Sequence, residues 1–302
     1  MPRVLVTGAN GLVGSRLVHA LATKGHQVIG TGRGERRSGQ APGAYVTADM
    51  TDSAALAIVV QEAAPDVIIH CGGMTDVDGC ERDRAGAWAA NVDATVTLCH
   101  SANSLGAQLV HVSTDYVFDG ADGPYDVDAL PNPRGVYAAS KYAAELAVRA
   151  LANSWTIART AVVFGWPAAG HANFGSWVLS SLRDGKQIKL FDDQWVSPTL
   201  ALNVAAMLCE IAEKKLTGMI HTSGAEVVDR VTFGQAVAAK FGFDARLITA
   251  SHMRDVKLAI PRPVRSGLKV TQTVARLGDA KPLSLGDALT QFKREYEEET
   301  AP

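Results

Sequence analysis

The stretch Thr7-Gly8-Ala9-Asn10-Gly11-Leu12-Val13-Gly14 decides the fold of this chain. It follows a short β-type run, and a helix is expected to begin near Leu12. Glycines at such a turn allow the tight bend, the approach of a pyrophosphate to the backbone, and close packing of the helix on the sheet. The helix N-terminus adds free N–H groups and the positive end of its dipole. The turn predicts a nucleotide site, with a purely structural turn as the alternative, formed by Gly8, Asn10, Gly11, Leu12, Val13 and Gly14.

The first half of the chain alternates Val/Ile-rich runs with Ala/Leu-rich stretches. The runs predict strands at 3–7, 27–31, 44–48, 66–70, 108–113 and 156–159, and the stretches predict helices beginning near Leu12, Ser53, Glu81 and Gly135. This alternation is typical of βαβ units. We therefore expect an α/β protein with a doubly wound parallel sheet, the Rossmann fold, whose ligands bind beyond the carboxyl ends of the strands.

The rhythm becomes less regular after residue 165. A Gly/Ala/His loop at 167–173 precedes an expected helix at 174–183. We expect a dinucleotide-binding Rossmann domain over 1–165 and a smaller substrate-binding lobe over 166–302, with segments of the lobe returning to the Rossmann sheet. Residues 260–263, Ile-Pro-Arg-Pro, predict a rigid extended segment or turn because proline fixes φ and donates no N–H. Residues 295–300 are expected to form a frayed acidic end.

The composition excludes several classes of protein. Of the 302 residues 47% are hydrophobic, and 29 basic side chains stand against 31 acidic ones, for a net charge of −2. A disordered chain needs fewer apolar residues and more net charge, and a nucleic-acid surface needs a basic excess. The longest apolar tract, near 200–212, is interrupted by Asn203 and Glu210, and the N-terminus lacks the apolar run of a secretory signal. We expect a cytoplasmic protein that binds neither nucleic acid nor membrane.

The cysteines show no metal-type spacing. They form no C-x-x-C pair, and their adjacent histidines have no second pair at zinc spacing. We therefore expect no metal and read all four as reduced, mostly buried thiols. They are Cys71, Cys80, Cys99 and Cys209.

The residues after the second expected strand bear on the choice of cofactor. An NAD site usually carries an acidic residue there to hold the ribose 2′-hydroxyl. This chain has Gly30-Thr31-Gly32-Arg33 instead, with Arg36 and Arg37 nearby. A guanidinium matches the oxygens of a 2′-phosphate, so NADP is favoured over NAD. The alternative is a solvated basic loop, which explains Arg36 and Arg37 better than Arg33.

Tyr137 and Lys141 lie four residues apart at the start of an alanine-rich helix, so their side chains project from one face. A nearby ammonium stabilises a phenolate and is expected to lower the pKa of the tyrosine from about 10 toward the working pH. Such a phenol can exchange a proton with a carbonyl. An exposed helix pair is the alternative, but Ser113 and Thr114 end the strand expected at the same edge of the sheet.

Together these features resemble the extended short-chain dehydrogenase/reductases, and among them most closely the dTDP-4-dehydrorhamnose reductases. The resemblance covers the whole chain and implies an NADPH-dependent oxidoreductase that reduces a 4-keto group on a nucleotide-linked deoxysugar. The motifs that carry it are Val77-Asp78-Gly79-Cys80-Glu81, Ser113-Thr114-Asp115-Tyr116-Val117-Phe118, Arg159-Thr160, Val163-Phe164-Gly165, Asp193-Gln194, Ser197-Pro198-Thr199, and Arg262-Pro263 followed by Ser266-Gly267-Leu268.

The resemblance implies a catalytic set. Thr114 would hydrogen-bond the reacting carbonyl, with Ser113 as the fallback hydroxyl. Tyr137 would be the general acid, and Lys141 would tune it and hold the nicotinamide ribose. Asn91 matches a helix asparagine that supports the active site.

The resemblance also implies binding residues. Asp49 and Met50 would lie against the adenine, and Cys71, Gly72 and Gly73 would line the cofactor. The candidates for contact with the substrate are Thr75, Asp115, Arg262 and Arg265. The two arginines suit a nucleotide-sugar diphosphate because two phosphates need paired cations.

The chain departs from the pattern of these reductases on the sugar side. They usually carry a tryptophan after Arg-Thr, whereas this chain continues Arg159-Thr160-Ala161. Trp166 or Trp195 could replace that aromatic platform, and His171 could touch substrate. His70 and His111 lie in apolar strand runs and are expected to be satisfied core residues without a role.

Two other functions stay open. The first is a nucleotide-sugar epimerase or dehydratase, although Thr114-Asp115-Tyr116 lacks the glutamate that dehydratases of this type carry. The second is a non-catalytic NADP-binding regulatory subunit, similar to the β subunit of methionine adenosyltransferase. The resemblance further implies a homodimer that packs the helices at 81–103 and 135–151.

Overall fold

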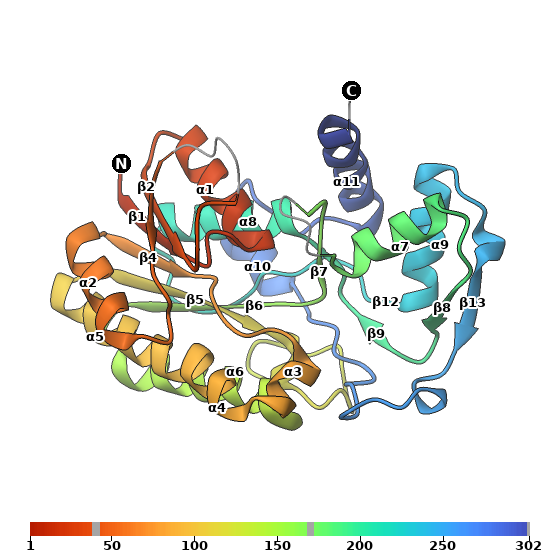
Figure 1. Cartoon of the computed structure of the whole chain (residues 1–302), viewed down its shortest axis with the longest axis horizontal. Helices are drawn as coiled ribbons and strands as arrows, with labels where there is room; N and C mark the ends of the chain where they lie inside the picture. The colour runs from red at the N-terminus through yellow and green to blue at the C-terminus, as the bar shows by residue number, and fades with distance from the viewer. Residues whose placement is uncertain (38–42, 168–171, 301–302) are drawn as a thin grey trace.

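The computed structural model describes residues 1–37, 43–167 and 172–300. Its centre is a seven-stranded parallel sheet in the order β11-β6-β5-β4-β1-β2-β3 (Figure 1). The strands are β1 (Arg3–Thr7), β2 (Gln27–Gly32), β3 (Ala44–Thr47), β4 (Val67–His70), β5 (Gln108–Thr114), β6 (Trp155–Thr160) and β11 (Gly218–His221). The doubly wound fold is confirmed. The order reverses between β1 and β4, and such a switch point opens the ligand crevice of this fold.

Helices cover both faces of the sheet. On one face α1 (Leu12–Thr23) lies against α8 (Ala201–Glu213). On the other face lie α2 (Ser53–Ala63), α5 (Ala94–Leu105) and α6 (Gly135–Leu151). The helix expected to begin near Glu81 is a bent series made of α3 (Val77–Arg82), α4 (Arg84–Trp88) and a π-helical turn, Ala89–Asp93.

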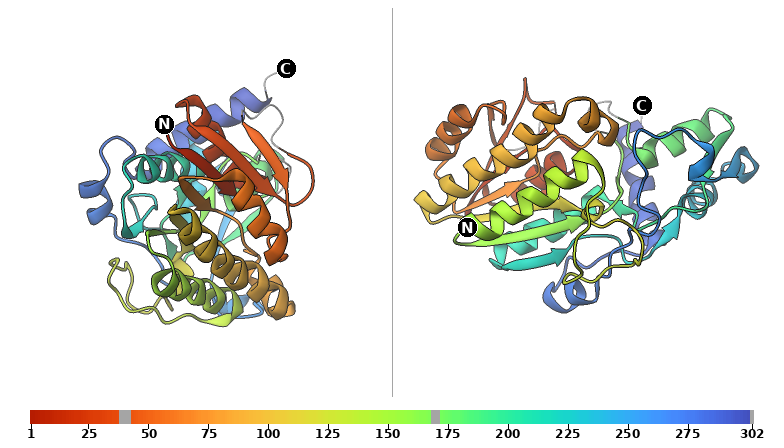
Figure 2. Two further views of the ribbon diagram at one scale, coloured as in Figure 1. Left: turned by 90° about the vertical axis from the view of Figure 1, so that its left-hand side faces the viewer. Right: turned by 90° about the horizontal axis from the view of Figure 1, so that it is seen from below.

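A smaller lobe lies at one end of the molecule, where Figures 1 and 2 show α7 (Phe174–Arg183), α9 (Arg230–Phe241), β8 (Ile188–Phe191) and β13 (Ile248–Ser251) grouped away from α2 and α5. Phe164, Phe233 and Phe292 centre its separate apolar core. Its other elements are β7 (Val163–Phe164), β9 (Trp195–Val196), β10 (Thr199–Leu200), β12 (Val228–Asp229) and α11 (Leu285–Thr300). The short helix α10 (Thr271–Arg276) lies instead against β11 of the central sheet, where Thr273 donates to the His221 carbonyl at 2.6 Å. Single 3-10 turns are formed by Asp115–Val117, Ala245–Leu247 and Met253–Asp255.

The structure contains one strand, β11, that the sequence analysis did not predict, and its last helix is longer than expected. β11 pairs in parallel with β6 and completes the sheet, although Gly218-Met219-Ile220-His221 has only a weak strand pattern. The expected frayed end at 295–300 is wrong, because α11 continues to Thr300. Arg16 on α1 holds it through an ion pair of 2.8 Å with Glu295. Among the described residues no helix is long and apolar enough to cross a bilayer.

Glu210 on α8 fixes the chain before α11. Its side chain is 5% exposed and accepts the N–H groups of Gly278, Asp279 and Ala280. Burial alone would raise the pKa of this carboxyl, but those hydrogen bonds and that of Lys214 outweigh it and lower the pKa from 4.5 to about 2. The charged form therefore stabilises the fold above pH 4.5, and this contribution is lost as the pH falls toward 2.

Glu210→Gln is expected to lower the free energy of unfolding by about 1–3 kcal/mol at pH 7, because a charged acceptor of several N–H groups is lost. The difference from the parent protein should shrink as the pH approaches 2. Urea unfolding at pH 7 and pH 3 measures both. Glu297→Gln, which removes an exposed carboxylate, is the control and should cost about 0–1 kcal/mol. A cost for Glu210→Gln that is the same at both pH values would contradict this account.

Candidate active site

The glycine turn has the geometry that close approach requires. Gly8 adopts a φ of +68°, and a Cβ on it would lie 2.7 Å from the Gly72 nitrogen. A Cβ on Gly14 would lie 2.2 Å from the Gly8 carbonyl oxygen. Gly11 caps α1 without a side-chain hydrogen bond, so Leu12 and Val13 begin a helix whose first N–H groups are open to a ligand. The turn therefore fits the pyrophosphate of a dinucleotide.

Asn10 makes hydrogen bonds to the loop after β2 that the sequence analysis did not predict. Its amide nitrogen donates to the Arg33 and Glu35 carbonyls and to the Tyr45 hydroxyl, and its oxygen accepts the Arg37 N–H. It thus orders the loop after β2. Its predicted contact with the cofactor stays a prediction.

Arg33 is exposed at the end of β2, near Asp49 at the end of β3. Hydrogen bonds from Thr51, and more weakly the charge of Arg33, hold the pKa of Asp49 below its usual value. Arg36 instead donates to the Gly43 and Ala44 carbonyls and lies 5.5 Å from the centre of the Tyr45 ring. These contacts give Arg36 a structural role, whereas Arg33 is exposed beside Asp49 and its contact with a 2′-phosphate stays a prediction.

The other predicted cofactor residues meet between β3, β1 and β4. A Cβ on Gly72 would lie 2.1 Å from Met50 Cε, and one on Gly73 would lie 2.7 Å from Asn91 Oδ1. Burial raises the pKa of Cys71 to about 12, so this thiol is protonated and packs as a small apolar group. The free cysteines agree with the expectation of reduced thiols.

The three predicted catalytic residues come together at the carboxyl end of β5. Thr114, Tyr137 and Lys141 are 6%, 8% and 5% exposed. The Thr114 hydroxyl donates to Asp115 Oδ1 at 3.1 Å and hydrogen-bonds to the Tyr137 phenol. Ser113, the fallback hydroxyl, donates to Glu145 Oε1 at 2.6 Å. Because the Ser113 hydroxyl is bonded to a buried carboxylate, Thr114 is the better candidate for the hydroxyl that contacts the substrate carbonyl.

The pKa of Tyr137 differs in direction from the expectation. Burial raises it, the charge of Asp115 adds to the effect, and the hydrogen bond with Thr114 opposes it. The expected lowering by Lys141 is therefore wrong for this structure, because the sequence did not show how deeply the phenol is buried. Tyr137 is a neutral phenol, which suits a proton donor. Burial lowers the pKa of Lys141 to about 8, against the raising effects of Glu145 and Cys71.

Asn91 supports the loop after β4. Its oxygen accepts the Met74 N–H at 2.8 Å, and its nitrogen donates to the Met74 carbonyl and to the Ser140 hydroxyl on α6. Through these bonds it ties Gly73 and Met74 to the helix that carries Tyr137.

The sequence reasoning missed Arg230. This residue begins α9 in the smaller lobe, donates from Nε to Gln194 Oε1 at 3.0 Å, and lies 4.3 Å from the centre of the Phe174 ring. Its charge acts on buried Asp115 and Tyr116. Burial raises the pKa of Asp115 to about 6. The sequence around Arg230, Val-Val-Asp-Arg-Val, contains no motif that marks it as functional. The only signal in the sequence was the Asp193-Gln194 motif, whose Gln194 contacts Arg230 in the folded chain.

Arg262 and Arg265, the two residues predicted to bind a diphosphate, differ in their burial. Arg262 is mostly buried and pairs with Asp78 on α3 at 2.7 Å, and its Nη1 has no partner among the described residues. Arg265 is exposed, and its backbone bridges to Trp195. Thr75 is exposed just before α3. The ion pair with Asp78 places Arg262 beside α3, the helix that Thr75 precedes.

The two tryptophans considered as a platform for the sugar also differ in their surroundings. Trp166 packs edge-on against Tyr296 of α11, 4.9 Å between ring centres, and so serves the lobe core. Trp195 is 40% exposed at β9 and stays the better candidate for a sugar platform. His171 lies outside the described residues.

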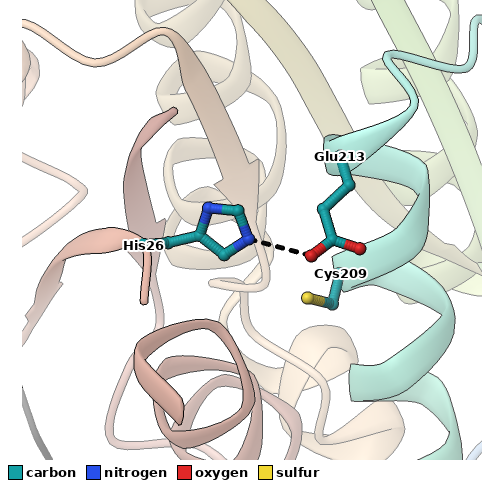
Figure 3. A group of neighbouring side chains, drawn as sticks. All are labelled: His26, Cys209 and Glu213. Atoms are coloured by element: carbon teal, nitrogen blue, oxygen red, sulfur yellow. Dashed lines mark hydrogen bonds and ion pairs between the residues drawn. The ribbon is translucent and has the colours of Figure 1, made fainter. Parts of the chain in front are cut away.

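Among the residues that the structure describes, two clusters of side chains could hold a metal ion. The first cluster comprises His26, Cys209 and Glu213 (Figure 3), and His26 Nε2 lies 2.9 Å from Glu213 Oε1. Two observations count against a metal ion there. Lys24 also pairs with Glu213, and burial raises the pKa of Cys209 to about 11, so its thiol is protonated. His26 precedes β2, so this cluster lies at the amino end of the sheet, opposite Thr114. The second cluster comprises Asp192, Asp193 and His252 in the smaller lobe.

Comparisons with known proteins agree with this geometry. The profile of the RmlD substrate binding domain family matches residues 2–297. A probable low-salt glycan biosynthesis reductase of Haloferax volcanii is 36% identical over 296 residues, 96% of this chain and 97% of that protein. A dTDP-4-dehydrorhamnose reductase of Mycobacterium tuberculosis is 32% identical over 277 residues, 89% and 86% of the two chains. The dTDP-4-dehydrorhamnose reductase of Bacillus anthracis, solved with NADP, superposes with a TM-score of 0.86 at 27% identity over 97% and 99%.

Proposed function

The chain belongs to the RmlD substrate binding domain family, and from that premise we propose that it is an NADPH-dependent reductase of a 4-keto group on a nucleotide-linked deoxysugar. The observation that carries the proposal is the buried set of Thr114, Tyr137 and Lys141 at the sheet edge that also holds the glycine turn. The relatives' printed activity makes dTDP-4-dehydrorhamnose the first substrate to test.

The residues present fit NADP. The open N–H groups at Leu12 and Val13 would hold the pyrophosphate, Arg33 the 2′-phosphate, and Asp49 and Met50 would lie against the adenine. Lys141 would donate to the nicotinamide ribose. When bound, NADPH supplies the hydride that reduces the carbonyl carbon.

The chain's own residues handle the proton and the developing charge. Tyr137 is a neutral phenol and can give its proton to the carbonyl oxygen as the alkoxide forms. Thr114 donates a hydrogen bond toward the same oxygen, and the cationic Lys141 favours the phenolate that remains. Because these groups are buried, their electrostatic effects are stronger than they would be in water.

The contacts with the nucleotide sugar would come from both parts of the chain. Arg262, which pairs with Asp78, has one buried guanidinium nitrogen without a hydrogen-bond partner among the described residues. Asp115 accepts the Thr114 hydroxyl, and Thr75 is exposed just before α3. Exposed Trp88 and Leu146 near the helices of the expected interface support a homodimer. Such an enzyme would work in the cytoplasm.

Arg33→Ala is expected to raise KM for NADPH at least about 10-fold and to leave KM for NADH unchanged, because one charge-assisted contact with phosphate is lost. Steady-state kinetics with both donors measures the change. Arg36→Ala, which removes the guanidinium over Tyr45, is the matched comparison and should change KM for NADPH less. Equal changes with NADPH and NADH would contradict the assignment of Arg33 to the 2′-phosphate.

The number of NADPH molecules oxidised per sugar formed distinguishes a reductase from the alternative functions. The proposal predicts one NADPH oxidised for each reduced sugar formed, which proton NMR of the product can count. An epimerase or dehydratase would turn over with retained cofactor and no added NADPH. A regulatory subunit would bind NADPH and an enzyme partner but reduce no sugar.

A further inference from the structure

A row of polar side chains crosses three strands directly behind the catalytic set. Thr7 on β1 is the register partner of His70 on β4, and His70 is the register partner of His111 on β5. All three are at most 1% exposed. Two residues earlier, the same strands contribute Leu5, Ile68 and Leu109, which belong to an apolar core cluster. The polar row therefore replaces apolar packing only at the carboxyl end of the sheet.

The row ends at Lys141. The Thr7 hydroxyl lies 2.6 Å from His70 Nδ1, the His70 and His111 ring centres are 5.3 Å apart, and His111 Nε2 lies 3.3 Å from Lys141 Nζ. Lys141 also donates to the Val112 carbonyl at 2.8 Å. Two of the three N–H groups of this ammonium are thus held from the strand side, and β5 provides both acceptors.

Packing alone does not account for the two histidines. His70 Nε2 and His111 Nδ1 are buried and have no hydrogen-bond partner among the described residues. Apolar side chains would fill this row without leaving ring nitrogens unpaired. Burial and the charge of Lys141 lower the pKa of both rings, that of His70 to about 3, so both are neutral at pH 7. A neutral His111 protonated at Nδ1 can accept a proton of Lys141 at Nε2.

We propose that His111, backed by His70 and Thr7, is a positioning residue that holds the Lys141 ammonium in place and extends the pH range in which Lys141 is charged. The inference rests on the proposed function only for its kinetic consequence. The contact itself exists without cofactor or substrate. A neutral acceptor favours the charged form of an amine, so the loss of His111 lowers the pKa of Lys141.

Other titratable groups around Lys141 act separately. Glu145 and Cys71 raise its pKa, and Arg159 on β6 already pairs with Glu145. Tyr137 lies one turn earlier on α6, where Asp115, Tyr116 and Cys80 act on it. None of these changes when only His111 is replaced, so a shift in the pH profile reports the His111 contact.

The kinetic test compares His111→Leu with His111→Gln. His111→Leu is expected to move the alkaline limb of the kcat profile about one unit to lower pH, as for the loss of one hydrogen bond to a charged group. It should also lower kcat about 5-fold at pH 8, because a fall of about one unit from a pKa of about 8 reduces the charged fraction of Lys141 from about one half to about one tenth. His111→Gln keeps an acceptor and should restore most of both. His221→Gln, at another buried histidine, is the control and should leave the profile unchanged. Equal shifts in the two His111 variants, or no shift in His111→Leu, would overturn the proposal.

A second measurement needs no activity. Imidazole nitrogen NMR of the ligand-free protein should show His111 as the neutral Nδ1–H tautomer, with an Nε2 signal that titrates near pH 8 together with Lys141. Lys141→Met should abolish this titration. A His111 signal that ignores the removal of Lys141 would overturn the contact. If the titration is present but no sugar is reduced, the proposed function fails and the contact stands.

Discussion

Tyr137→Phe is expected to lower kcat at least about 100-fold while NADPH affinity stays within about 2-fold of the parent value, because the variant loses only a proton donor. The phenol is 8% exposed and hydrogen-bonds to Thr114. Its pKa is raised by burial, so the group enters the reaction protonated. Stopped-flow turnover and NADPH binding by fluorescence quenching measure the two quantities.

The matched control is Tyr142→Phe on the same helix, since Tyr142 packs beside the separate cluster around Phe118. It removes a hydroxyl group without touching the catalytic set and should leave kcat unchanged. If Tyr137→Phe keeps parental turnover, Tyr137 is not the general acid. If NADPH affinity also collapses, the loss of rate cannot be assigned to proton transfer.

Arg159→Met is expected to lower the free energy of unfolding by about 3–5 kcal/mol, the cost of leaving one member of a buried ion pair without its partner. Arg159 Nη2 and Glu145 Oε2 lie 2.6 Å apart, and the two side chains are 4% and 1% exposed. After the substitution the Ser113 hydroxyl is the one hydrogen-bond partner left to the Glu145 carboxylate among the described residues. Urea unfolding at pH 7 measures the cost.

The double variant Arg159→Met with Glu145→Gln should recover part of that cost, because the unpaired charge is removed. Lys293→Met, at an exposed pair with Glu297, should cost about 0–1 kcal/mol. A loss below about 1 kcal/mol in Arg159→Met, or no recovery in the double variant, would contradict the role of this pair in joining β6 to α6.

The local motifs could be predicted from the sequence because their spacing fixes their geometry. The glycine turn depends on residues within one turn of chain, and Tyr137 and Lys141 share a helix face at a separation of four residues. The carboxyl end of β5 then brings Thr114 to them, as the alternation of strands and helices predicts.

What could not be predicted depends on tertiary packing. Arg230 contacts Gln194, and its charge acts on Asp115, only because the tertiary fold brings α9 near the residues that follow β5. The short β11 has too weak a strand pattern to be recognised without its partner β6. The pKa of Tyr137 depends on burial, which the spacing of residues does not reveal. The contact between His111 and Lys141 could not be predicted either, because the two residues are 30 positions apart and meet only when α6 packs against β5.

The central claim is most directly tested by following NADPH absorbance with dTDP-4-dehydrorhamnose, beside the same assay with NADH and with Tyr137→Phe. The account predicts steady NADPH oxidation, slower turnover with NADH, and near-complete loss of turnover in the variant. Tight NADPH binding without any oxidation of NADPH in the presence of this sugar nucleotide would contradict it.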